Sequence, residues 1–365
     1  MEHMEKINVS LGPRSYPVMI GRGLIAACGE QVRETLGPCA AAIVTDDRVG
    51  PLFLAKTEKS LADAGLRTAS IVLPHGEAVK SLDSLPGLYA FLAETGITRS
   101  DAVVALGGGV IGDLAGFAAA TWLRGVRFVQ IPTSLLAQVD ASVGGKVAVD
   151  LPQGKNLVGA FWQPSLVLCD PDALTTLSGR FWRDGLGEVV KVGCIADEAL
   201  FALLERTAPG GREALMARMD TILRRCIQVK ADTVAQDERD TGRRMTLNFG
   251  HTVGHAVEVC EGYAGHAHGE AVAIGMAAVT RLSEARVLTA PGTLARLTAL
   301  LEALGLPAAL PAIPEEALIA AIRRDKKNAG DTLRAVLLRR IGECFLYPTD
   351  LSFFRGMTAP ETAAE

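Results

Sequence analysis

The first part of the chain contains four predominantly apolar runs, at residues 39–47, 68–74, 101–109 and 128–134. Such runs are typical of strands that are buried on both faces of a parallel sheet. Segments with helical spacing separate them, one ending near Gly65 and another covering about 81–95. This alternation of strands and helices predicts a parallel α/β domain.

Further patterns lie within this domain and after it. Residues 1–25 predict a β-hairpin, and 144–156 predict a hairpin or a loop between layers. After about residue 170 helical spacing dominates, and 334–348 indicate a late pair of strands, while the tail 358–365 is expected to fray. We therefore predict an α/β domain over 1–170 and a mainly helical domain over 171–365. Helices are expected over 184–206, 211–237, 246–262, 269–305 and 314–325.

Composition narrows the functional class. The 365 residues carry a formal net charge of −4, which argues against a nucleic-acid partner or an anionic membrane surface. No apolar run approaches the roughly 20 residues that a membrane span needs. Seven scattered cysteines without a CxxC pair indicate reduced thiols rather than a disulfide framework. The N-terminus lacks the pattern of a signal peptide, so a soluble, cytoplasmic protein is expected.

Four of the six histidines fall between residues 251 and 268. His251 and His255 are four residues apart and share one face of a helix, and His268 opens the next helical pattern. Neutral imidazoles on helices suit zinc-like metals, and zinc and cobalt fit such donors equally well. The spacing leaves two ligand sets open: His251, His255 and Glu258, or a set that contains His268 and a remote carboxylate such as Glu188. The remaining histidines are interpreted as ordinary core or surface residues: His3, His75 and His266.

Polar residues extend this helical face upstream. Arg244, Asn248, His251 and His255 follow helical spacing, so one face of a helix through these residues would present a cation, an amide and two imidazoles. The inward face of a structural helix would be apolar. This pattern is the strongest purely physical argument for a site.

Glycine-rich segments indicate a phosphate-bearing ligand. Residues 106–117 follow a predicted strand and open a helix, where glycines let a nucleotide phosphate approach backbone N–H groups. Asp46 ends an early strand and suits either a ribose hydroxyl or a helix N-cap. Glu77 and Lys80 lie in the next strand-end loop. Lysines among the glycines of residues 138–156 suit phosphate or carboxylate groups, although a solvated loop explains any single lysine equally well.

These segments together resemble the 3-dehydroquinate synthases of the sugar-phosphate cyclase superfamily. The similarity covers about residues 40–348 and is carried, in the family's order, by GGGVIGDLAGFAAATWLRG, QIPTSLLAQVDASVGGKVAVDLPQGKN, LNFGHTVGHAVE, HGEAVAIGM and DKKNAGD. The resemblance implies a Rossmann-like NAD-binding α/β domain joined to a helical metal-binding domain. It also implies an active site in the cleft between them, and a homodimer.

The resemblance also implies roles for individual residues. The zinc or cobalt ligands would be Glu188, His251 and His268, so His255 would contact substrate or transfer a proton instead. NAD contacts would come from Asp46, Glu77, Lys80, Gly109, Val110, Ile111, Gly112, Asp113, Thr133, Ser134, Lys155 and Thr176. Substrate and catalytic roles would fall on Arg124, Asp140, Lys146, Asn156, Lys191, Lys230, Arg244, Asn248, His255 and Lys326. Asp240, at a position that is usually glutamate, and residues 176–183 depart from the family's pattern.

The implied reaction converts 3-deoxy-D-arabino-heptulosonate 7-phosphate into 3-dehydroquinate. The C5 hydroxyl is oxidised with NAD⁺, phosphate leaves by β-elimination, C5 is reduced again, and the ring opens and closes by an aldol step. Rival hypotheses are a cyclase acting on another sugar phosphate, a metal-dependent polyol dehydrogenase, and a non-catalytic nucleotide-binding module. Lys146, Arg244 and Asn248 match the dehydroquinate pattern, which favours the dehydroquinate synthase interpretation over a cyclase for another sugar phosphate.

Overall fold

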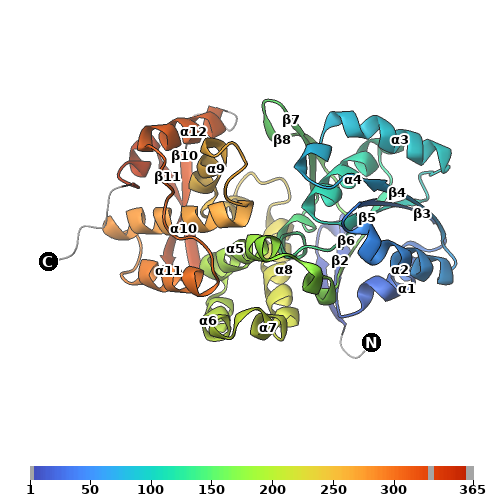
Figure 1. Ribbon diagram of the computed structural model, residues 1–365, viewed down its shortest axis with the longest axis horizontal. Helices are drawn as coiled ribbons and strands as arrows, with labels where there is room; N and C mark the ends of the chain where they lie inside the picture. The colour runs from blue at the N-terminus through green and yellow to red at the C-terminus, as the bar shows by residue number, and fades with distance from the viewer. Residues whose placement is uncertain (1–3, 328–332, 359–365) are drawn as a thin grey trace. The chain divides into compact units, whose positions relative to one another are not determined.

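The computed structural model describes residues 4–327 and 333–358 (Figure 1). The interpretations of His3 and of residues 359–365 therefore lie outside the described residues. The chain divides into two compact units. The first unit contains Met1–Leu177 and Met219–Arg239, and the second contains Ser178–Arg218 and Asp240–Glu365.

One seven-stranded sheet organises the first unit. Its neighbouring strands are parallel except for the antiparallel pair at one edge, β1 and β2. The predicted Rossmann-like parallel sheet and the N-terminal hairpin are thus confirmed. One strand, β9, was not predicted, because a run of four residues is too short to stand out in the pattern. In spatial order the strands are β1 (Glu5–Val9), β2 (Tyr16–Ile20), β9 (Leu166–Cys169), β6 (Arg127–Pro132), β5 (Ala102–Gly107), β3 (Ala40–Asp46) and β4 (Arg67–Leu73).

Helices cover both faces of this sheet (Figure 1). Side chains alternate between the two faces along each strand. Ala42 and Val44 of β3 pack with helices α3 (Leu85–Glu94) and α4 (Gly109–Thr121). Ala41 and Ile43 pack on the other side, with α1 (Cys28–Leu36) and α2 (Gly50–Asp63). Burial on both faces explains why the strands read as continuous apolar runs.

Shorter elements complete the first unit. The segment expected to form a hairpin or loop is a hairpin, with β7 (Lys146–Leu151) antiparallel to β8 (Gly154–Phe161). A single π-helical turn, η6 (Ala137–Ala141), precedes it. Short 3-10 segments are η1 (Gly12–Arg14), η2 (Leu24–Ala27), η3 (Glu77–Val79), η4 (Leu82–Ser84), η5 (Trp122–Arg124) and η7 (Pro171–Thr176).

Helix α8 (Met219–Gln236) packs against β1 and β2 of the first unit, although the chain on either side of it belongs to the second. Its buried face is apolar, with Ile222, Leu223 and Ile227 fully covered. Ion pairs hold α8 to other parts of the first unit at three points along its length. They join Asp220 to Arg22, Arg224 to Glu5 and Lys230 to Asp140.

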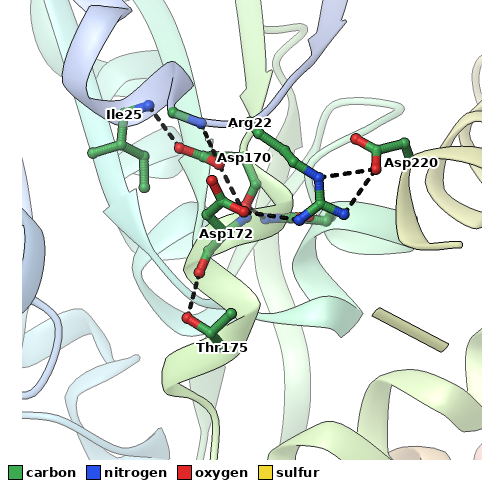
Figure 2. A network of polar contacts seen from close by, with 8 residues as sticks. Arg22, Ile25, Asp170, Asp172, Thr175 and Asp220 are labelled. Atoms are coloured by element: carbon green, nitrogen blue, oxygen red, sulfur yellow. Dashed lines mark hydrogen bonds and ion pairs between the residues drawn. The ribbon is translucent and has the colours of Figure 1, made fainter. Parts of the chain in front are cut away.

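Figure 2 shows the network at the start of α8. The buried carboxylate of Asp170 accepts hydrogen bonds from three backbone amides, those of Gly23, Ile25 and Asp172, at 3.0–3.1 Å. Arg22 links Asp172 on η7 to Asp220 on α8 through contacts of 2.9 and 2.8 Å. Asp170 therefore fixes the turn before η2 to the start of η7, and Arg22 joins η7 to α8.

The second unit is mainly helical, as predicted. Several long predicted helices are interrupted: Asp197, which accepts the amide of Leu200 at 2.9 Å, ends one helix and caps the next. The late strand pair is confirmed by the antiparallel β10 and β11. The elements are α5 (Gly179–Ala196), α6 (Glu198–Thr207), η8 (Ala208–Gly210), α7 (Gly211–Met216), η9 (Arg243–Asn248), α9 (His251–Cys260), α10 (His268–Ala285), α11 (Thr293–Ala303), α12 (Glu315–Lys327), β10 (Leu333–Arg340), β11 (Glu343–Thr349) and η10 (Leu351–Phe354).

Among the described helices, none combines the length and the apolar character that crossing a membrane requires.

Candidate functional site

Three helices of the second unit bring Glu188, His251 and His268 together. One donor atom from each residue lies within 4.8 Å of the others. The Nε2 atoms of both imidazoles are 3.6 Å from Oε1 of Glu188. His251 and His268 follow Glu188 by 63 and 80 positions in the sequence, and both meet one of its carboxylate oxygens.

Glycines let these helices approach closely enough to form the group. A Cβ atom on Gly187 would lie 2.2 Å from the carbonyl oxygen of Gly269, so α5 and α10 cross with backbone against backbone. A Cβ on Gly275 would lie 2.0 Å from the carbonyl oxygen of Gly250, which brings α9 against α10 in the same way. Each of the three donor residues is the chain neighbour of one of these glycines, since Glu188 follows Gly187, His251 follows Gly250 and His268 precedes Gly269.

The electrostatics of the group suit a metal cation. Glu188 is only 1% exposed, and its Oε2 contacts the ammonium of Lys191, which leaves Oε1 directed at the histidines. Burial, helped by the charge of Lys191, lowers the pKa of His251 well below its usual value, so its imidazole is neutral and able to act as a ligand. Although burial opposes its charging, hydrogen bonds with Glu188 and Glu258 raise the pKa of His268 to about 10. One carboxylate and two imidazoles form a donor set that fits zinc or cobalt.

His255 lies beside this group. Its ring centroid is 5.4 Å from that of His251 and 5.8 Å from that of His268. Together with Glu258 and His268 it forms a second set of donor atoms within 4.8 Å, which shares one histidine with the first. His266 is instead paired with Glu261, at 2.9 Å.

The predicted continuous helical face from Arg244 to His255 is wrong. Arg244 and Asn248 lie on the 3-10 segment η9, and α9 begins only at His251. Phe249 has an extended ψ of 127°, and Gly250 a left-handed φ of 80°, so the chain turns between them. Arg244 is buried and Asn248 is exposed.

The glycine-rich turn of the first unit joins β5 to α4. Asp113, on the second turn of this helix, lies 2.6 Å from the buried ammonium of Lys80. Lys80 also donates to Oδ1 of Asn156 at 2.5 Å. Burial raises the pKa of Asp113 to about 6, against the pull of Lys80. Three predicted site residues, from a strand-end loop, a helix and the β8 strand, therefore converge.

Neighbouring strand ends carry other predicted cofactor residues. The amide of Thr133 donates to the carbonyl of Gly107 at 2.9 Å, so Thr133 and Ser134 follow β6 beside the glycine-rich turn. Within that turn, Ile111 is 1% exposed and packs into the core, which leaves only its backbone for a ligand. Gly109, Val110 and Gly112 form the rest of the first turn of α4.

Asp46 caps the turn before α2. Its Oδ1 accepts the amides of Arg48 and Val49 at 2.9 and 2.8 Å. Asp46 is thus not the N-cap of α2, which is Val49, but it holds the turn that leads into the helix. Glu77 is exposed on η3, and Thr176 is exposed at the end of η7.

The predicted substrate residues occupy different places. Asp140 on η6 contacts the ammonium of Lys230 through both its side chain and its carbonyl. Arg124 is exposed and has a left-handed φ of 68°, a conformation that non-glycine residues rarely adopt. Lys146 is exposed at the start of β7, and Lys155 is half-buried in β8. Lys326 falls at the end of α12, and its side chain lies outside the described residues.

Sequence reasoning did not single out two acidic residues at these sites. Asp150 accepts the amide of Asn156 at 2.7 Å, which helps to hold the left-handed backbone of Asn156. Asp184 accepts the amide of Gly269 at 2.7 Å, at the crossing of α5 and α10. Its position four residues before Glu188, on the same face of a helix, was the available signal.

Comparison with known families gives matches over most of the chain. Residues 70–184 match the model of the 3-dehydroquinate synthase N-terminal domain, and residues 185–328 match that of the C-terminal domain. The chain is 46% identical to a 3-dehydroquinate synthase from Clostridium beijerinckii over 96% of its own length and 100% of the relative's. A 3-dehydroquinate synthase from Streptococcus suis is 44% identical over 94% of this chain and 96% of the relative.

Solved structures show a similar architecture. A 2-epi-5-epi-valiolone synthase from Streptomyces hygroscopicus, with NAD⁺ and Zn²⁺ bound, superimposes with a TM-score of 0.87 at 29% identity. The match covers 95% of this chain and 97% of that one. A 2-deoxy-scyllo-inosose synthase, at 24% identity and a TM-score of 0.86 over 96% and 98% of the two chains, shares the fold.

Proposed function

The chain belongs to the 3-dehydroquinate synthase family, and from this premise we propose that it converts 3-deoxy-D-arabino-heptulosonate 7-phosphate into 3-dehydroquinate and phosphate. The reaction uses NAD catalytically together with a divalent metal, as the second step of the shikimate pathway. The observation that carries the proposal is the convergence of Glu188, His251 and His268 in a chain that is 46% identical to a 3-dehydroquinate synthase over 96% of its length.

The second unit supplies the metal site in this proposal. Glu188, His251 and His268 hold Zn²⁺ or Co²⁺, the first of which is bound in the valiolone synthase structure. When bound, the ion supplies Lewis acidity that polarises the oxygen on C5 of the substrate. Lys191 holds Oε2 of Glu188, so that the other carboxylate oxygen stays directed at the two imidazoles.

The first unit binds the cofactor. Its glycine-rich turn and strand-end loops contact NAD through Asp46, Glu77, Lys80, Gly109, Val110, Ile111, Gly112, Asp113, Thr133, Ser134, Lys155 and Thr176. When bound, the nicotinamide supplies a hydride acceptor that returns the hydride before product leaves, so NAD shows no net change. Lys80 forms an ion pair with Asp113 and donates a hydrogen bond to Asn156. These contacts preorganise the cofactor region before ligands bind.

Cationic and polar side chains bind the substrate's carboxylate and phosphate. Arg124, Lys146 and Arg244 supply positive charge for these two anionic groups. Asn156 and Asn248 donate hydrogen bonds from their side-chain amides. Lys230 is held by Asp140, and this pairing orients its ammonium. His255 transfers a proton through a ring nitrogen, and Lys326 adds a further cation.

The assembly is proposed from the family resemblance, and the location from composition. We propose a homodimer in the cytoplasm, with neither nucleic acid nor membrane as a partner. The formal charge of −4 supports the absence of nucleic-acid and membrane partners, and the seven cysteines, all of them thiols, support the cytoplasmic location.

A phosphate-release assay tests the activity. With the heptulosonate phosphate and substoichiometric NAD⁺, we expect one phosphate per substrate and no accumulation of NADH. A chelator should stop the release, and added Zn²⁺ or Co²⁺ should restore it. Steady accumulation of NADH would instead favour a polyol dehydrogenase.

The likeness to a valiolone synthase makes another sugar-phosphate cyclase the alternative to test. The matched control substrate is a heptulose phosphate that lacks the carboxylate. We expect it to react more slowly, because Lys146 and Arg244 would lack their anionic partner. Faster turnover of this control than of the heptulosonate would contradict the proposed substrate.

A further inference from the structure

Two carboxylates flank His268, one at each ring nitrogen. Its Nε2 lies 3.6 Å from Oε1 of Glu188, and its Nδ1 lies 3.3 Å from Oε2 of Glu258. Glu258 is on α9, seven residues after His251 on the same helix face, and only 6% of it is exposed. A buried carboxylate is costly unless a polar partner compensates it, and the imidazole of His268 is such a partner.

The contact with Glu258 determines which nitrogen of His268 can bind a metal. An ionised carboxylate only accepts hydrogen bonds, so Nδ1 of His268 carries the hydrogen. In the neutral form of the ring, which metal binding requires, the lone pair is then on Nε2, the atom that faces Glu188. His251 is arranged alike: its Nδ1 lies 3.2 Å from the carbonyl oxygen of Phe249, another pure acceptor, and its Nε2 faces the same Glu188 oxygen.

From this geometry we infer that Glu258 is a positioning residue of the metal site, which fixes the tautomer and the ring orientation of His268. The inference rests on the proposed function, since it concerns the metal that this function requires. Acceptors behind metal-bound imidazoles commonly hold them in the correct tautomer and increase their basicity. Here a backbone carbonyl serves His251, and a side-chain carboxylate serves His268.

The same donor atoms allow a competing interpretation. Glu258, His255 and His268 also lie within 4.8 Å of one another and could themselves bind a cation. That arrangement would need Nδ1 of His268 as the ligand, because Nδ1 is the nitrogen that faces Glu258. The two interpretations therefore make opposite predictions for the nitrogen that binds the metal and for the severity of Glu258 variants.

Zinc affinity of purified full-length variants provides the test, measured by competition with a chromogenic chelator. We expect Glu258→Leu to weaken Zn²⁺ binding by about 10- to 100-fold. Glu258→Gln keeps an accepting carbonyl of the same size and should lose less. Glu261→Gln is the matched control, since Glu261 pairs with Nδ1 of His266 at 2.9 Å near the same helix end but contacts no proposed ligand.

A second readout separates positioning from general destabilisation. NMR of nitrogen-labelled histidine in the zinc-loaded protein should show Nε2 of His268 bound to the metal and Nδ1 protonated. Thermal unfolding of the same variants shows whether a weakened affinity merely follows a loss of stability. The isosteric Glu258→Gln protein keeps the test decisive even where Glu258→Leu folds poorly.

Three results would overturn the inference. Unchanged Zn²⁺ affinity in both Glu258 variants would show that Glu258 has no role at the metal site. Loss of zinc in Glu258→Gln as complete as in His251→Ala, or a metal bound at Nδ1 of His268, would make Glu258 a ligand. A wild-type protein that binds no zinc would contradict the proposed function and the inference together, whereas the first two results contradict the inference alone.

Discussion

Two histidines one helical turn apart have different surroundings. His251 is buried, its Nε2 faces Glu188, and its pKa is well lowered, whereas His255 is more exposed and lies outside that donor group. The i, i+4 spacing placed both on one face but could not distinguish them, because the distinction depends on a carboxylate 63 residues upstream of His251. Only tertiary packing brings that carboxylate to one of the two.

We expect His251→Ala to lose bound metal and activity together. His255→Ala should retain the metal, while turnover falls by about 100-fold or more, as for loss of a proton-transfer group. Elemental analysis beside steady-state kinetics checks both variants. Equal loss of metal in the two would contradict the proposed division of roles.

Asp101 connects two strands of the first unit through its carboxylate. It accepts the amide of Ala40 at 2.7 Å, and the amide and hydroxyl of Thr98 at 2.8 and 2.6 Å. Burial tends to raise its pKa, but these hydrogen bonds outweigh burial and the pKa is lowered. Because the folded pKa lies below the unfolded one, the stabilisation is present above the unfolded pKa, about 3.9, and is lost as the pH falls through the folded value.

Asp101→Asn should therefore lower the free energy of unfolding by about 1–3 kcal/mol at pH 7, since a side-chain amide cannot accept at both positions. The gap between variant and wild type should narrow below about pH 4, where the wild-type carboxyl becomes protonated. Urea unfolding at a series of pH values measures this gap. A gap independent of pH would show that the charge of Asp101 contributes nothing.

At the scale of elements, glycine contacts determine how α5, α9 and α10 pack. No side chain separates α5 from α10 at Gly187 and Gly269, and two of the proposed ligands, Glu188 and His268, are the residues next to these glycines. Moving the helices apart by the width of a methyl group would separate the donor atoms as well. The stability of this crossing and the geometry of the donor group are thus coupled.

Gly269→Ala should lower both stability and zinc affinity, because its Cβ would lie 1.8 Å from the carbonyl oxygen of Asp184. Overpacking of this kind costs about 1–3 kcal/mol or more. Gly87→Ala is the control: it also lies within a helix, but no atom lies within 4 Å of the added Cβ, so the variant should be unchanged or about 0.4–1 kcal/mol more stable. Normal zinc binding by Gly269→Ala would contradict the coupling.

The elements show where prediction from sequence succeeded and where it could not. Buried parallel strands such as β5 (Ala102–Gly107) were recognisable because every position of the strand is apolar. The break between Arg244 and His255 could not be predicted from the sequence. It depends on the left-handed backbone of Gly250 and on the packing of this glycine against Met276 and Val272 of α10. Nor does the pattern of α8 indicate that its apolar face lies against β1 and β2, since an amphipathic helix does not specify its partner.

At the scale of the whole molecule, the two units carry the proposed sites for different ligands. We expect Zn²⁺ to raise the melting temperature of the second unit and NAD⁺ to raise that of the first. At a free concentration 100 times the dissociation constant, each ligand should add about 2.7 kcal/mol to the stability of its unit. Differential scanning calorimetry with and without a chelator measures both effects.

His251→Ala should abolish the response to zinc and preserve the response to NAD⁺, which makes it the internal control. A zinc-dependent shift that survives in this variant would mean that the metal stabilises the protein through other residues.

The placement of α8 has a consequence for the order of events during synthesis. The sheet of the first unit is complete once Cys169 has been made, but the helix that covers β1 and β2 ends at Gln236. At about 5–20 residues per second, the ribosome needs roughly 3–13 s to make the intervening residues. During that interval the face of the β1–β2 edge that α8 will bury remains open to solvent. The nascent sheet is therefore a natural substrate for ribosome-associated chaperones, and slowing translation between residues 170 and 236 should increase aggregation more than slowing it after residue 240.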